Sequence, residues 1–204
     1  MVKSSKLKSI YGKKTVEDQK KIYKEWAATY DADTTGEYGW MGFRPAAEEL
    51  AKRITDKNAH ILDAGCGTGL AGVALSKLGY DNIDGKDLSP EMLEKASRTG
   101  VYQILSEVDL TKTLSIANPY DAVFSCGVFG FGPPYAEHLR HLVAATKSGG
   151  YVVVTVNGHG WAEKKWSTEL PKVITEFDLN LEAQLDIEYL ENEGIDGKLL
   201  IFKA

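Results

Sequence analysis

The sequence predicts an α/β fold: a seven-stranded, mostly parallel sheet covered by helices, with an antiparallel C-terminal hairpin strand and an N-terminal helical cap. Three observations predict it. From residue 60 onward, apolar β-branched segments alternate with segments of helical periodicity. A glycine-rich turn at 65–69 joins the first expected strand to a helix. The last two expected strands, 185–190 and 198–202, are too close in sequence for a crossover, so the final strand must be antiparallel.

Length and charge favour one domain that binds a small molecule. The 204 residues suit a single domain, in which we expect a flexible tail at 1–14, a helical cap at 15–57 and a cofactor-binding sheet at 58–204. The net charge of −5 argues against a nucleic-acid partner, and no apolar run has the length of a membrane span. The two distant cysteines form no metal pattern and fit a cytoplasmic setting. We expect a monomer or a homodimer.

The cap is predicted from an amphipathic segment at 15–30, whose apolar residues partly recur at helical spacing. Asp, Thr and Gly residues break this segment at 31–39. A second helix follows, with Pro45 near its first turn, where proline is tolerated.

Beyond the cap, strands and helices alternate in sequence. Strands are expected at 60–64, 82–87, 101–108, 120–125 and 151–156, and helices at 70–78, 89–99, 137–147 and 161–177. Ser89 and Pro90 fit the N-cap and first turn of a helix, whereas Pro171 predicts a kink or break. Gly194 and the Asp196-Gly197 pair predict the turn of the final hairpin.

The glycine turn is the first candidate for a binding site. Gly65, Gly67 and Gly69 lie between a strand and a helix, where the missing Cβ atoms allow the backbone to approach a ligand. A tight strand–helix turn would explain the glycines alone. The acids at successive strand ends favour a ligand: Asp63 precedes the glycines, Asp87 lies about 20 positions after Gly67, and Asp109 follows the next strand.

These acids indicate which nucleotide would bind. A carboxylate at the end of the second strand can accept hydrogen bonds from ribose hydroxyls, and one at the end of the third can accept from an adenine amine. Asp63 would repel a pyrophosphate and attract a cation, and the third glycine is one residue early for a dinucleotide site. The pattern therefore favours S-adenosylmethionine, which carries an ammonium and a sulfonium, over NAD.

Three segments resemble the class I S-adenosylmethionine-dependent methyltransferases: 61–69, 85–93 and 22–31. Within that superfamily the chain is most similar to the Williams–Beuren-region methyltransferase-like proteins, over about residues 20–157. The resemblance implies a Rossmann-like sheet, S-adenosylmethionine as cofactor and S-adenosylhomocysteine as product. Lys86 departs from the pattern, because this position in the second strand is usually apolar; such a lysine must reach solvent or pair with an acid.

The resemblance also implies roles for individual residues. Gly65 and Gly67 would lie beneath the methionine portion of the cofactor, with Asp63 near its amino group, directly or through water. Asp87 would hold the ribose and Asp109 the adenine amine. The remaining contacts would be Leu88 and Met92 flanking the adenine, Leu110 beside Asp109, Cys126 near the sulfonium, and Trp26 and Tyr30 closing over the methionine end.

Methyl transfer from a sulfonium requires alignment and removal of water, and a base only when the nucleophile holds its proton tightly. His159, between two glycines after the fifth strand, is the candidate base, although a surface histidine would fit the same pattern. An aromatic set suggests the acceptor pocket, although core packing would also explain each member: Tyr38, Trp40, Phe43, Phe129 and Trp161.

The expected function is methyl transfer to an O, N or S atom of a small organic molecule. Two alternatives keep the cofactor: a non-methylating activity, such as a cyclisation that uses the sulfonium charge, or a protein methyltransferase. Gly132-Pro133-Pro134-Tyr135 is similar to the Asn-Pro-Pro-Tyr box of enzymes that methylate nucleic-acid bases. It lacks the Asn and lies beyond the end of the fourth strand, so base methylation is not expected.

Overall fold

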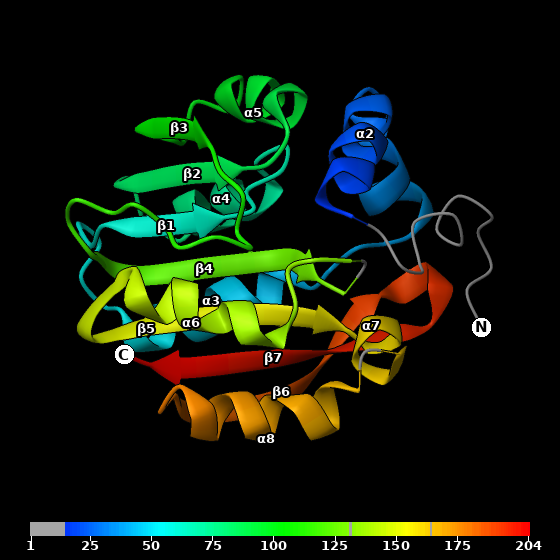
Figure 1. Ribbon diagram of the computed structural model, residues 1–204. Coiled ribbons are helices and arrows are strands. Elements are labelled where there is room, and N and C mark those ends of the chain that lie inside the picture. The colour runs from blue at the N-terminus through cyan, green and yellow to red at the C-terminus, as the bar shows by residue number, and fades with distance from the viewer. Residues whose placement is uncertain (1–14, 131, 164) are drawn as a thin grey trace.

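The computed structural model describes residues 15–130, 132–163 and 165–204 (Figure 1). The tail expected at 1–14 lies outside these residues. One seven-stranded sheet has the order β3-β2-β1-β4-β5-β7-β6, and β7 alone runs antiparallel to its neighbours. The strands are β1 Ile61–Ala64, β2 Ile83–Asp87, β3 Ile104–Glu107, β4 Tyr120–Phe129, β5 Thr146–Asn157, β6 Asn180–Leu190 and β7 Ile195–Lys203. The predicted fold class is confirmed.

Helices cover both faces of the sheet (Figure 1). Alternate side chains of β1 point to opposite faces of the sheet. Ile61 packs in the core with α3 and α4, and Leu62 packs in the core with α6 and α8. The α-helices are α2 Val16–Trp26, α3 Phe43–Arg53, α4 Leu70–Lys77, α5 Pro90–Ser97, α6 Leu139–Ala144, α7 Gly158–Glu163 and α8 Trp166–Glu176. The shorter helical turns are η1 Ala32–Glu37, η2 Ala136–His138 and η3 Glu191–Glu193. In the described part of the chain, no helix has the length and apolar character needed to cross a membrane.

The cap differs from the sequence prediction. Its first helix ends at Trp26 instead of continuing to residue 30, and the segment expected to be a break contains the π-helix η1. Hydroxyl groups account for the wider turn, since Thr34 Oγ1 donates to the carbonyl of Tyr30 at 2.7 Å and Thr35 Oγ1 to that of Asp31 at 2.6 Å.

Two expected helices are also wrong in their bounds. Where one helix was expected at 137–147, the structure has the short turn η2 followed by α6, which ends at Ala144. Thr146 lies in β5 and pairs with Tyr120 of β4. The helix expected at 161–177 is divided into α7 and α8, and Lys165 between them has a left-handed φ of 52°. Pro171 does not break α8; it lies on an exposed face of that helix.

The C-terminal hairpin has longer strands and a shorter turn than expected. Gly194, with a φ of 64°, ends the turn as predicted. Asp196 and Gly197 belong to β7, where Gly197 pairs with Asn157 on one side and Ile187 on the other. A glycine is needed at position 197 because a Cβ there would lie 2.7 Å from the ring of Tyr189.

Two of the parallel strands also differ from their expected bounds: β3 is shorter than expected, and β4 continues to Phe129.

Candidate functional site

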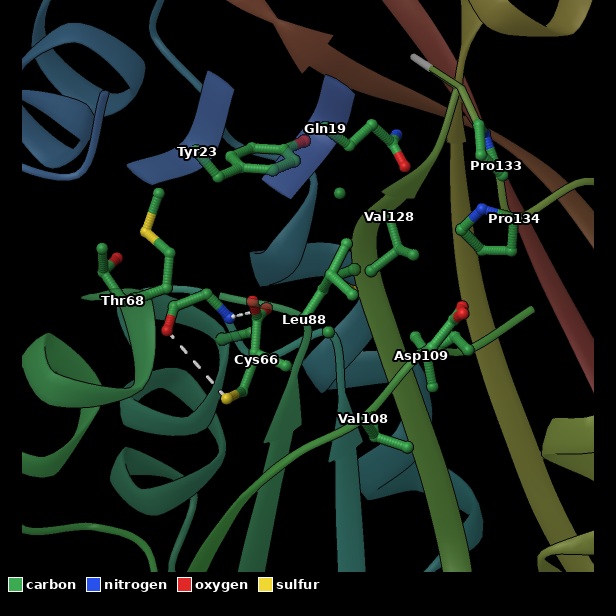
Figure 2. Close-up of a pocket in the computed structure, with 18 of the residues that line it drawn as sticks. Gln19, Tyr23, Cys66, Thr68, Leu88, Val108, Asp109, Val128, Pro133 and Pro134 are labelled. Atoms are coloured by element: carbon green, nitrogen blue, oxygen red, sulfur yellow. Dashed lines mark hydrogen bonds between the residues drawn. The ribbon is translucent and has the colours of Figure 1, made fainter. Parts of the chain in front are cut away.

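The carboxyl ends of β1, β2 and β4 open into a cavity of about 810 Å³, counted with the open space at its mouth. Figure 2 shows Gln19 and Tyr23 of α2 on one side and Val128, Pro133 and Pro134 on the other. The cap is tied to the glycine turn, because Thr68 Oγ1 donates to Asp31 Oδ1 at 2.5 Å.

The glycine turn forms the cavity floor. Gly65 and Gly67 have φ values of 78° and 54°, which other residues rarely adopt. A Cβ at Gly65 would lie 2.2 Å from Cγ2 of Val128, whereas a Cβ at Gly67 would meet nothing within 4 Å. A side chain at position 65 would therefore both strain the backbone and collide with Val128. At position 67 only the backbone conformation requires glycine, and the space beside its Cα belongs to the cavity.

Asp87 lies at the end of β2 and faces the cavity. One carboxylate oxygen accepts from the backbone N–H of Gly67 at 2.8 Å, and the other from that of Ser89 at 2.9 Å. Burial raises the pKa of this carboxyl above its ordinary value, while these backbone donors act to lower it. Each oxygen can accept a further hydrogen bond, so the group is suited to a pair of ribose hydroxyls.

Asp63 is fully buried and is not among the residues that line the cavity. Its Oδ2 accepts from the hydroxyl of Tyr102 at 2.7 Å, and its Oδ1 has no hydrogen-bond partner in the described part of the chain. Burial raises the pKa of Asp63 to about 7, and the nearby charge of Asp87 acts in the same direction. An unpaired buried carboxylate oxygen fits the predicted role toward an amino group, which would satisfy it directly or through water.

Asp109 lines the cavity, and its carboxylate already has partners. It accepts from the backbone N–H of Thr111 at 2.9 Å and from Thr111 Oγ1 at 2.6 Å. Partial burial acts to raise its pKa, but the hydrogen bonds from Thr111 and Lys112 hold that pKa below its ordinary value. Asp109 is thus a turn residue that also presents a carboxylate to the cavity.

Several other predicted cofactor residues line the same cavity: Tyr30, Leu88, Met92, Leu110 and Cys126. Trp26 does not. Its Nε1 donates to Asp33 Oδ2 at 2.6 Å, and its ring packs edge-on against Tyr30 with centroids 4.7 Å apart. Lys86 donates to Ser106 Oγ at 2.8 Å, so this lysine pairs with a hydroxyl instead of an acid.

Of the five aromatic residues proposed for the acceptor pocket, only Trp40 lines the main cavity. Tyr38 lines a smaller cavity behind it, and Phe43 packs against Trp40. Phe129 and Trp161 both pack on Trp166, at centroid distances of 5.8 Å and 5.9 Å, away from the main cavity. Phe129 is the last residue of β4 and Trp161 lies in α7 just after β5, but both rings pack on Trp166 of α8 and not in the cavity.

His159 does not line the cavity either. It lies in α7 and not in a projecting loop, and its Nε2 is 2.9 Å from Glu163 Oε1. No cluster of three or more His, Cys, Asp or Glu side chains suited to a metal ion occurs within the described ranges.

The sequence analysis did not assign several cavity residues, among them Gln19, Tyr23, Val128, Pro133 and Pro134. Helical spacing held a signal for the first two, because Gln19 and Tyr23 share a face of the cap helix with Trp26. The two prolines lie in the segment that resembles a base-methylation box, and they reach the cavity although they follow β4.

Comparison with known proteins shows that part of this chain is similar to methyltransferases. Residues 61–150 match the family model described as a methyltransferase domain. Human methyltransferase-like protein 27 is 34% identical over 138 residues, which are 66% of this chain and 56% of that protein. Trans-aconitate 2-methyltransferase of Enterobacter sp. (strain 638) is 32% identical, over 58% of this chain and 47% of that protein. The chain thus spans about half the length of these curated relatives.

A solved structure shares nearly the whole fold. It is a TehB-like SAM-dependent methyltransferase from Corynebacterium glutamicum, which has 25% sequence identity and a TM-score of 0.65. The match covers 89% of this chain and 97% of that one, so it extends well beyond the segment matched by the family model.

Proposed function

We propose that the chain is a class I S-adenosylmethionine-dependent methyltransferase that transfers the methyl group of S-adenosylmethionine to an O, N or S atom of a small organic molecule. The similarity of residues 61–150 to a methyltransferase domain and the fold shared with a SAM-dependent methyltransferase support the proposal. One observation carries the proposal: Asp87, the glycine turn and Asp109 face one cavity that α2 closes from above (Figure 2). The acceptor would be a free small molecule and not a nucleic acid, and the reaction would take place in the cytoplasm.

The cofactor would be held by residues of this chain that fit its parts. Asp87 has acceptor capacity for the ribose, and Leu88 and Met92 offer apolar contact for the adenine, whose amine would meet Asp109. The methionine portion would cross the open space above Gly67, with its amino group satisfying Asp63 Oδ1 directly or through water. When bound, S-adenosylmethionine supplies the methyl group and leaves as a neutral thioether, so no acid is required.

The enclosure of the cavity supports a small acceptor. Gln19, Tyr23 and Pro134 line the part of the cavity that the proposed cofactor residues do not line. Removal of water from this part would favour displacement at the methyl carbon.

The test is transfer of a radiolabelled methyl group. The protein is incubated with labelled S-adenosylmethionine and a cell extract that has been divided into metabolites and macromolecules. We expect the label in the metabolite fraction, and an Asp87→Ala variant serves as the control. Label in the protein fraction alone would contradict the small acceptor, and cofactor binding without transfer to either fraction would contradict methyl transfer.

A further inference from the structure

The wall of the main cavity beside the cap is aromatic. Tyr23, Tyr30 and Trp40, together with Gly127, line both this cavity and the smaller one behind it, so these residues form the partition between the two. A Cβ at Gly127 would lie 2.9 Å from the ring of Trp40. Since Gly127 follows Cys126, which is proposed to lie near the sulfonium, the partition lies beside the expected position of the methyl group.

The main cavity has acidic and no basic side chains among its described lining residues, and the charge of Asp87 acts on Tyr23 and Tyr30 of the wall. Among the described residues that line the main cavity, the charged side chains are Asp87 and Asp109, and none is Lys, Arg or His. Burial raises the pKa of Tyr30, and the neighbouring hydroxyls of Tyr23 and Tyr189 and the carboxylate of Asp87 add to the shift. Burial followed by the charge of Asp87 also raises the pKa of Tyr23. Both phenols therefore stay protonated at neutral pH and supply no base.

We propose that the methyl acceptor is an amine whose nitrogen attacks as the free base and is cationic in the product; this inference rests on the proposed function. The nitrogen lone pair forms the new N–C bond while the C–S bond breaks and its electron pair stays on sulfur. The positive charge thus passes from sulfur to nitrogen. Electron-rich aromatic faces attract a cation, so Tyr23, Tyr30 and Trp40 stabilise the charge on both atoms.

Other acceptor classes fit the wall less well. A carboxylate would lose its hydration in a cavity that has no Lys, Arg or His among its described lining residues. An alcohol holds its proton tightly and would need a base, and the tyrosines that face it remain protonated. A tertiary amine that has lost its proton to solvent before it binds needs no further proton transfer, because the product nitrogen carries no proton.

Three probes of nearly identical shape separate charge from size: choline, its neutral isostere 3,3-dimethylbutan-1-ol, and the anion 3,3-dimethylbutanoate. Each is titrated by calorimetry into the protein saturated with S-adenosylhomocysteine. We expect choline to bind at least about fivefold more tightly than the alcohol, with the anion weakest. Equal binding of the three, or preference for the anion, would overturn the amine proposal. Failure of S-adenosylhomocysteine to bind in the first step would instead overturn the proposed function.

Substitution of an aromatic residue of the wall tests whether the wall causes the preference for choline. Trp40→Leu should weaken choline binding about fivefold and leave the alcohol within about twofold. Phe177→Leu is the matched control, because this aromatic residue lies outside both cavities and its substitution should change neither affinity. Tyr23→Leu replaces Trp40→Leu if that variant no longer binds S-adenosylhomocysteine, because Tyr23 also lines both cavities. An unchanged ratio of choline to alcohol affinity in the variant that folds would refute the role of the wall.

Discussion

Asp63, which is fully buried, and Asp87, which is half-buried at the cavity, lie at the ends of adjacent parallel strands, and no described basic side chain pairs with either. Burial without a cationic partner costs stability in the unliganded protein, and it is tolerated where a ligand supplies the missing partners. Asp87 contacts backbone donors of the glycine turn as well, so it shapes the site in addition to facing the ligand.

Asp87→Ala should weaken S-adenosylmethionine binding by about tenfold to a hundredfold, because hydrogen bonds to a charged group contribute roughly 1.5–3 kcal/mol each. Calorimetry measures the affinity directly. Asp56→Ala is the control, since Asp56 is exposed and lies far from the cavity lining. Binding by Asp87→Ala as tight as in the parent would refute the ribose assignment.

Asp63 should make cofactor binding depend on pH. Its pKa in the folded protein, about 7, exceeds the ordinary value of 3.8, so the unliganded protein loses stability as the pH rises between these values. The cationic amino group of the cofactor favours the ionised carboxyl. Affinity should therefore increase about tenfold from pH 6 to pH 8 and level off above that range.

Titrations at several pH values measure this dependence, and Asp63→Asn is the control because an amide does not ionise. In that variant the affinity should be low and nearly constant over the same range. A parent protein whose affinity is also constant would show that Asp63 does not contact the cofactor.

At the scale of elements, the turn between β1 and α4 is set by conformation and by packing. Gly65 and Gly100 both have positive φ values, 78° and 70°. A Cβ at Gly65 would collide with Val128, but a Cβ at Gly100 would meet nothing within 4 Å. The pair therefore separates the cost of the left-handed conformation from the cost of the collision.

Gly100→Ala should destabilise the protein by about 1 kcal/mol and leave cofactor affinity unchanged, because only backbone strain is added. Gly65→Ala should lower the unfolding temperature further and greatly reduce cofactor affinity. Thermal unfolding and calorimetry measure both effects, and a second change, Val128→Ala, should restore part of the loss. Equal behaviour of the two alanine variants would contradict the collision.

The sequence predicted elements whose signals are local. The motif at 63–69 placed the glycine turn correctly, and Ser89 with Pro90 gave the start of α5, where Ser89 Oγ accepts from the N–H of Met92. The division between α7 and α8 was not predictable, because it occurs near a lysine in a left-handed conformation and not at Pro171. The π-helix η1 was missed because its support comes from hydroxyls of Thr34 and Thr35.

At the scale of the whole molecule, the topology followed from chain length between strands, whereas the acceptor side of the cavity depended on packing between distant segments. Phe129 ends β4 and Trp161 lies in the helix that follows β5, yet both pack on Trp166 of α8. Conversely, Gln19 and Pro134 are far apart in sequence and line one cavity. Contacts of this kind leave no periodic pattern in a single sequence.

A ligand that binds the folded protein stabilises it by mass action. S-adenosylmethionine at 100 times its dissociation constant should add about 2.7 kcal/mol, which raises the unfolding temperature by roughly 5–10 °C in a chain of this size. A thermal-shift measurement tests this, with NAD at the same concentration as the control. No shift with S-adenosylmethionine would show that the cavity is not its site.

The central claim is that the carboxylates at the strand ends select a cationic adenosine ligand. Calorimetric titration of the protein with S-adenosylmethionine and, separately, with NAD tests it most directly. The account predicts micromolar binding of S-adenosylmethionine and no measurable binding of NAD. Binding of NAD with equal or greater affinity, or binding of neither compound, would contradict it.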